Sequence, residues 1–228
     1  MCGRYAATTP ASAIAEIFKV DVLPDVLPRY NVAPTQSVIA VVADGGKRQM
    51  KKFRWGLAPS WAKEGKPNAG MINARAETVA EKPALRSAFK KRRCLVPADG
   101  FYEWMAAATG KTPYLIGMGD RRPFAIAGLW EVWRDKADPE KDPLFTCSVV
   151  TVGPNALMEP IHDRMPLILP ESAWDAWMSA DTPIEEIKAM LVPFPADDMV
   201  ARQVSKVVNN ARNEGPQCQA DPEPEGQA

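Results

Sequence analysis

The apolar segments of this chain are short, and prolines interrupt them throughout. The 228 residues include 22 prolines, and the apolar runs between them have the length of strands, as in RRCLVPA, TPYLIGM, PFAIAGLW and LFTCSVVTV. Helices do not alternate regularly with these runs, which argues against a doubly wound α/β fold. We therefore expect an α+β fold, with a mixed, barrel-like β-sheet core flanked by short helices.

Turn and capping residues locate several of the expected elements. The turn residues DGG at 44–46 follow a strand-like run at 37–43, and this order predicts a hairpin. The segment TPASAIAEIFKV predicts a helix with Thr9 as its N-cap. Two further short helices, each introduced by a proline, are expected at 170–180 and 182–191.

The C-terminal segment differs in composition from the rest of the chain. Residues 214–228, EGPQCQADPEPEGQA, carry four acidic residues and no basic one. This composition predicts disorder, so we expect a single domain at 1–213 followed by a disordered acidic tail. The formal net charge is zero, and removing the four tail acids leaves 28 basic against 24 acidic residues, or +4. The basic runs KRQMKKFR and KKRR fit either a solvated surface or a nucleic-acid contact.

Several classes of protein are disfavoured. No run approaches 18 apolar residues, and the N-terminus lacks a basic stretch followed by an apolar one, so we expect no membrane span and a cytoplasmic, nucleoid-associated protein. Four cysteines and one histidine match no zinc pattern, and there is no phosphate-binding glycine loop. We expect neither a metal nor a cofactor. Cys94 and Cys147 lie in strand-like runs and are expected to be buried and inert.

Cys2 differs from the other cysteines because it follows the initiator methionine. Removal of Met1 would leave an α-amine and a thiol on the same residue. The pKa of an α-amine is about 7.7–8.0, against about 10.4 for lysine, so much of the amine is neutral near pH 7. Such an amine can add to an aldehyde and lose water to give a Schiff base. The adjacent thiol can then close a five-membered ring in an intramolecular step.

Other segments carry candidate functional side chains. His162, in EPIHDRMPLIL, is the only histidine and could be structural or catalytic. Glu103 lies between aromatic residues in GFYEWM, where lost hydration would raise its pKa, unless it faces water on a strand. Asn73 and Arg75 would share one face of a strand and suit an oxygen-rich group. Trp61 could stack on unpaired bases or belong to the core.

Taken together, these segments resemble the SRAP family of SOS-response-associated peptidase-like, or abasic-site processing, proteins. The resemblance covers residues 2 to about 210 and rests on MCGRY, RYNVAPTQ, RWGLAPSWA, INARAET, RRCLVPADGFYEW, AGLWE and IHDRMPLIL, in this order. It implies the SRAP fold and a sensor that captures abasic sites in single-stranded DNA. The capture would be a covalent thiazolidine crosslink that protects the site from strand breakage during the DNA damage response.

The resemblance also implies roles for particular residues. The implied catalytic residues are Cys2, Asn73, Glu103 and His162, and the implied DNA contacts are Arg4, Trp61, Arg75 and Arg164. Glu103 would act as general acid and base, His162 would assist the Schiff-base step, and Asn73 would orient the amine or the sugar. A Schiff base beside the sugar also permits β-elimination, which would give a lyase side activity. The expected partners are single-stranded DNA and single-strand to duplex junctions, bound by a monomer.

Two other functions use the same residues. The first is a cysteine peptidase or amidohydrolase in which Cys2 attacks and His162 is the base, with self-removal of Met1 as one version. The second is a binding module without chemistry, in which Cys2 has no special task. These functions are distinguished by what Cys2 forms with an aldehyde-bearing DNA strand.

Overall fold

The core of the molecule is a closed β-barrel. The computed structural model describes residues 2–21, 26–107 and 110–223. Five strands pair in a ring, because the last strand of the order β10–β4–β3–β6–β9 pairs again with the first. Their bounds are β3 Ser37–Asp44, β4 Lys47–Trp55, β6 Arg93–Ala98, β9 Phe124–Trp133 and β10 Leu144–Val152. β10 runs parallel to β4 while the other pairs of the ring are antiparallel, which confirms the expected mixed, barrel-like core.

The hairpin β3–β4 forms where the sequence predicts it. Asp44 pairs with Lys47, so Gly45 and Gly46 alone make the turn. Their φ angles are 58° and 78°, the left-handed conformation that a type I′ hairpin turn requires at both positions and that glycine adopts without strain. Short strands extend the barrel sheet at its margins: β5 Asn73–Arg75, β11 Met165–Pro166 and β12 Ile168–Leu169.

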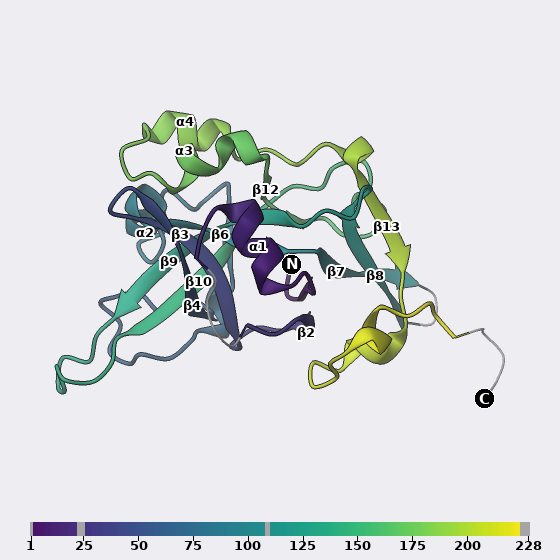
Figure 1. The fold of residues 1–228 in the computed structure, drawn as a ribbon, viewed down its shortest axis with the longest axis horizontal. Helices are drawn as coiled ribbons and strands as arrows, with labels where there is room; N and C mark the ends of the chain where they lie inside the picture. The colour runs from purple at the N-terminus through teal and green to yellow at the C-terminus, as the bar shows by residue number, and fades with distance from the viewer. Residues whose placement is uncertain (1, 22–25, 108–109, 224–228) are drawn as a thin grey trace.

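A second, five-stranded antiparallel sheet has the order β13–β8–β7–β1–β2. Its strands are β1 Tyr5–Ala7, β2 Arg29–Val32, β7 Gly100–Ala107, β8 Gly110–Met118 and β13 Met199–Gln203. Figure 1 shows β7, β8 and β13 beside the barrel strands, with the N-terminus between the two groups. Because β1 lies between β7 and β2, the first residues of the chain run along β7.

Short helices lie around these sheets, as expected. They are α1 Ala11–Phe18, α2 Arg86–Lys91, α3 Trp174–Met178 and α4 Ile184–Ala189, with single 3-10 turns at η1 Ala69–Met71, η2 Glu171–Ala173, η3 Ala196–Asp198, η4 Lys206–Asn209 and η5 Pro216–Gln219. α3 and α4 lie together on one side of the barrel (Figure 1). Thr9 is not the N-cap of α1: that position is Pro10, and the Thr9 hydroxyl donates to Asp99 instead.

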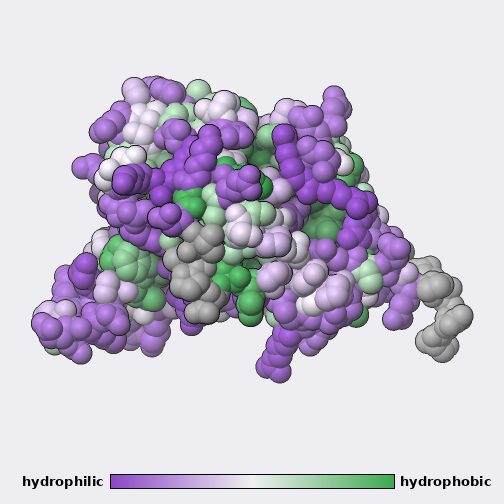
Figure 2. Space-filling model, viewed as in Figure 1, coloured by the Kyte–Doolittle hydropathy of each residue, from purple (hydrophilic) through white to green (hydrophobic). Residues whose placement is uncertain are grey.

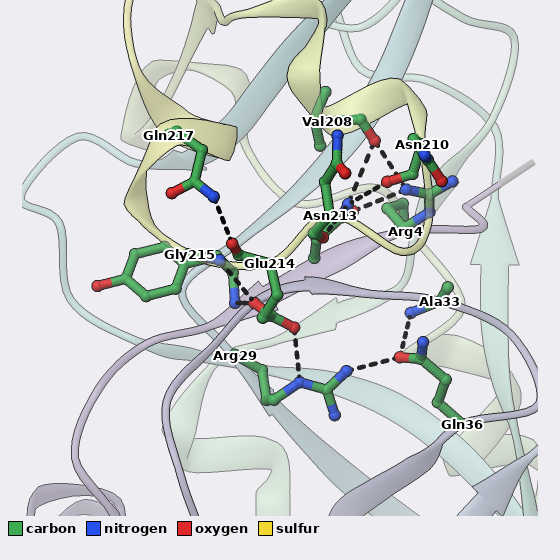
Figure 3. Close-up of polar contacts among 12 residues, drawn as sticks. Arg4, Arg29, Ala33, Gln36, Val208, Asn210, Asn213, Glu214, Gly215 and Gln217 are labelled. Atoms are coloured by element: carbon green, nitrogen blue, oxygen red, sulfur yellow. Dashed lines mark hydrogen bonds and ion pairs between the residues drawn. The ribbon is translucent and has the colours of Figure 1, made fainter.

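The acidic tail is not disordered where the structure describes it. Glu214 accepts hydrogen bonds from Arg29 Nε at 2.8 Å and from the Tyr30 amide (Figure 3). Cys218, in η5, is 0% exposed and joins a small apolar cluster with Tyr102 and Val208. The fold therefore extends past residue 213. The composition of the tail could not reveal that Glu214 and Cys218 have partners far away in the sequence. Residues 224–228 of the predicted tail lie outside the described residues.

Figure 2 shows a mainly hydrophilic face with separate hydrophobic patches. Within the described ranges, no helix is long and apolar enough to cross a membrane. The predicted burial of Cys94 and Cys147 is confirmed, because both are 0% exposed.

Candidate functional site

Cys2 is buried although it lies next to the end of the chain. It is 1% exposed and packs in the main core, three residues before β1 begins. Burial raises the pKa of the Cys2 thiol, and the neighbouring Glu103 carboxylate raises it further. The thiol is therefore protonated at neutral pH and depends on a base for activation.

Glu103 is buried on the middle of β7 and is 3% exposed, so it does not face water. Burial raises the pKa of its carboxyl to about 7. The sequence suggested that the adjacent aromatic residues raise this pKa, but they do not. Tyr102 and Trp104 point to the opposite face of the strand, where they belong to the cluster around Cys218. The carboxyl is desolvated by the core on the other face.

His162 lies opposite Glu103. Its Nε2 is 3.8 Å from Glu103 Oε2, which is a close contact rather than a hydrogen bond. The Arg164 amide donates to Nδ1 at 3.0 Å, which leaves the proton of the neutral ring on Nε2, facing Glu103. Burial lowers the pKa of His162, although Asp163, 2.9 Å from Nδ1, favours the charged form. The ring is mainly neutral at pH 7.

Asn73 lies at the start of β5, which runs parallel to β10 with Asn73 opposite Val149. A chain of contacts leads from it to the N-terminal strand: Trp55 Nε1 donates to the Ile72 carbonyl, and the Trp55 ring packs edge-on against Tyr5. Both polar atoms of the Asn73 amide are buried, and neither has a hydrogen-bond partner among the described residues. Such a group is costly to leave unpaired and is typical of a side chain that binds a ligand.

Arg75 and Arg164 both lie next to Thr151, near the end of β10. Arg75 pairs with Thr151 and is exposed, while Arg164 Nη2 donates to the Thr151 carbonyl at 2.7 Å. The Arg164 guanidinium also binds both carboxylate oxygens of Glu77, at 2.6 and 3.0 Å. Sequence reasoning missed Glu77, although it lies inside the segment INARAET.

Arg4 and Trp61 lie in different environments. Arg4 Nη1 donates to Asn31 Oδ1 at 2.7 Å and to the Val208 carbonyl at 2.8 Å (Figure 3), which gives Arg4 a task inside the fold that the sequence did not indicate. Trp61 is 64% exposed in the loop after β4, whereas Trp55 is buried in the core. The DNA contacts assigned to Arg4 and Trp61 stay predictions.

The site thus places Glu103 beside His162 and near enough to the buried Cys2 to raise the pKa of its thiol. It combines a protonated thiol, a carboxyl that titrates near neutral pH and a mainly neutral imidazole, which suits nucleophilic chemistry with proton transfer. Within the ranges that the structure describes, no group of three or more histidine, cysteine, aspartate or glutamate side chains could hold a metal ion.

This fold and site have counterparts in known proteins. The family model described as SOS response associated peptidase (SRAP) matches residues 1–211, and the chain belongs to this family. The abasic site processing protein YoqW of Bacillus subtilis is 43% identical over 222 residues, which cover 95% of this chain and 98% of that protein. The abasic site processing protein HMCES of Xenopus tropicalis is 33% identical over 85% of this chain and 66% of its own length.

A solved structure has the same fold. A crystal structure of a protein from Bacteroides thetaiotaomicron superposes with a TM-score of 0.87 at 25% identity, over 96% of this chain and 99% of that one. The expected SRAP fold is therefore confirmed.

Proposed function

We propose that this protein captures abasic sites in single-stranded DNA as a covalent thiazolidine at Cys2, after Met1 has been removed. The observation that carries the proposal is a buried Cys2 near the N-terminus whose thiol pKa responds to Glu103, a buried carboxyl that lies 3.8 Å from His162. The similarity to abasic site processing proteins over nearly the whole chain supports the same function.

The chemistry is balanced without any further reagent. The open-chain abasic sugar is an aldehyde, and the neutral α-amine of Cys2 adds to its carbon. The resulting hydroxyl leaves as water, which gives a Schiff base. The Cys2 sulfur then bonds to the same carbon and the thiol proton moves to the nitrogen, which closes the five-membered ring. The second step is intramolecular and gains the corresponding effective concentration.

The acid–base properties of Glu103 fit these steps. Its carboxyl, with a pKa of about 7, is present in both forms at neutral pH. The protonated form can donate to the leaving hydroxyl, and the ionised form can accept the proton of the Cys2 thiol. His162 carries its ring proton on Nε2 and can donate to a sugar oxygen, and the buried Asn73 amide can hold the amine or the sugar.

The same geometry does not favour a cysteine peptidase. A peptidase of that type activates its thiol by a lowered pKa and an adjacent imidazole base. Here the pKa of the Cys2 thiol is raised, and the His162 Nε2 faces Glu103. An attack that begins at the amine does not need a thiolate, so the raised thiol pKa is compatible with crosslinking.

The test is to mix the protein with a single-stranded oligonucleotide that carries one abasic site, and to measure intact mass and denaturation-resistant complex. The wild-type chain without Met1 is expected to gain the mass of the oligonucleotide minus one water. Cys2→Ala is expected to lose the thiazolidine. Cys2→Ser keeps the amine, so it is expected to give a Schiff base that borohydride traps, but no stable ring.

A chain with an uncleaved N-terminal extension is the matched control, because it keeps the Cys2 thiol while its nitrogen stays in a peptide bond. It should form no thiazolidine. A stable adduct from that chain or from Cys2→Ser would contradict the mechanism. The absence of any adduct with the processed wild-type chain would overturn the proposed function. A duplex with the same site should react more slowly, because the sugar is less accessible.

A further inference from the structure

One buried side chain ties the N-terminal strand to the C-terminal end of the fold. Asn31, in β2, is 0% exposed. Its Nδ2 donates to the carbonyl of Asn213 at 2.9 Å, with longer contacts to those of Asn210 at 3.1 Å and Val208 at 3.3 Å. Its Oδ1 accepts from Arg4 Nη1 at 2.7 Å. A buried amide whose donors and acceptor are both used has one orientation, and Asn31 therefore holds residues 208–213 in a single position.

The same segment, residues 208–213, here called the C-terminal loop, contacts Arg4, just before β1, and Trp104, on β7. The Val208 carbonyl accepts from Arg4 Nη1 at 2.8 Å (Figure 3), and Asn209 Oδ1 accepts from Trp104 Nε1 at 2.7 Å. The Arg4 guanidinium also lies over the Trp104 ring, 5.6 Å from its centroid. The loop thus contacts the residue two positions after Cys2 and the residue next to Glu103.

A backbone hydrogen bond connects these loop contacts to the segment that carries Cys2. The Tyr102 amide donates to the Arg4 carbonyl at 2.9 Å, which sets how β1 lies along β7. Once Met1 is removed, Cys2 is held by the chain on one side only, and chain ends are ordinarily frayed. A displacement of about 1 Å between reacting groups can cost roughly 100-fold in rate. A device that fixes Arg4 against Trp104 also limits the movement of Cys2 relative to Glu103.

We propose that the C-terminal loop is a clamp for the N-terminal nucleophile, and that Asn31 and Asn209 are positioning residues that act through Arg4 and Trp104. Its effect on DNA capture rests on the proposed function, whereas its effect on the position of Cys2 does not. The clamp sets the rate of the chemical steps. In this proposal Arg4 serves the fold rather than a DNA phosphate, so the affinity for DNA is unchanged.

The test compares two variants with a control just before the C-terminal loop, at the start of η4. Asn31→Asp keeps an oxygen for Arg4 but has no amide protons for the loop carbonyls, and Asn209→Ala removes only the partner of Trp104 at an exposed position. Lys206→Ala changes an exposed side chain nearby and is the control. At saturating abasic single-stranded DNA, we expect the crosslinking rate to fall about tenfold in Asn31→Asp and about threefold in Asn209→Ala. The affinity for intact single-stranded DNA should stay within about twofold, and Lys206→Ala should change neither quantity.

A second measurement needs no crosslink. Iodoacetamide labelling followed by peptide mapping reports the accessibility of Cys2, and both variants should be labelled at Cys2 several-fold faster than the wild type while Cys94 stays protected. If the wild-type chain forms no crosslink, the proposed function fails, and the labelling rates alone then decide whether the clamp exists. Unchanged rates of crosslinking and labelling in both folded variants would overturn the clamp. A loss of DNA affinity without a loss of maximal rate would also overturn it.

Discussion

Two regions of this molecule bury an ionisable side chain, and they use it differently. Arg93, in β6, is 1% exposed and donates to the carbonyls of Phe89 and Lys90 at the end of α2 and to those of Trp177 and Ser179 at the end of α3. Glu103, in β7, is 3% exposed and faces His162 and Cys2. Burial lowers the pKa of Arg93 to about 10 and raises that of Glu103 to about 7.

The comparison separates a structural charge from a reactive one. Arg93 stays charged at neutral pH because its shifted pKa is still far above 7, and its bonds join two helices to the barrel. Glu103 changes its protonation near neutral pH, which is what a general acid–base requires. Burial alone therefore does not indicate function; the pH at which the buried group titrates does.

The largest expected effect is on the free energy of unfolding, and it tests the structural role of Arg93. Arg93→Met removes the donors to four backbone carbonyls, and we expect a loss of about 3–5 kcal/mol in the free energy of unfolding. Urea unfolding at pH 7 measures it. Arg86→Met, an exposed arginine on α2, is the control and should change stability by less than about 0.5 kcal/mol. A loss in Arg93→Met as small as in the control would show that Arg93 does not join the helices to the barrel.

The next effect is on the pH dependence of stability, and it tests whether Glu103 titrates near neutral pH. Because the pKa of Glu103 is about 7 in the fold and about 4.3 in an unfolded chain, the folded state binds more protons between these values. Its contribution to stability is present at low pH and is lost as the pH rises through 7. Glu103→Gln removes this loss of stability, so above pH 7 the variant should be more stable than the wild type by on the order of 3–4 kcal/mol.

Urea unfolding at pH 4.5, 6 and 8 checks the pH profile of the Glu103→Gln variant. The difference between the two proteins should grow from pH 4.5 to pH 8. Glu159→Gln, an exposed carboxyl, is the control and should give no such trend. A constant difference across these pH values would mean that the Glu103 carboxyl does not titrate near 7 in the fold.

The smallest effect concerns an ion pair that is only partly buried. Glu77 holds the Arg164 guanidinium with two hydrogen bonds, and a DNA phosphate at this place would compete with it. Under the proposed function, Glu77→Gln should raise the affinity for intact single-stranded DNA about threefold and make its salt dependence steeper. Fluorescence anisotropy at two salt concentrations measures both, with the exposed Glu81→Gln as control. Weaker binding by Glu77→Gln would show that Glu77 orients Arg164 for DNA.

Several features could be predicted because they depend on neighbouring residues. Two glycines after a strand predicted the β3–β4 hairpin, and proline-led segments predicted α3 and α4. The burial of Glu103 was one of two alternatives that the sequence left open. Its supposed cause was wrong, because alternation along β7 turns Tyr102 and Trp104 away from the carboxyl.

Local sequence was enough to predict the short strands and their turns, and to show that only Cys2 can present an amine and a thiol together once Met1 is removed. Both follow from local covalent structure and local pattern. Long-range packing placed Cys2 in the core near Glu103, folded the acidic tail as far as η5, and joined Arg4 to the C-terminal loop through Asn31. The last of these contacts links residues about 180 positions apart, and no periodicity or composition within one segment encodes the partner at that distance.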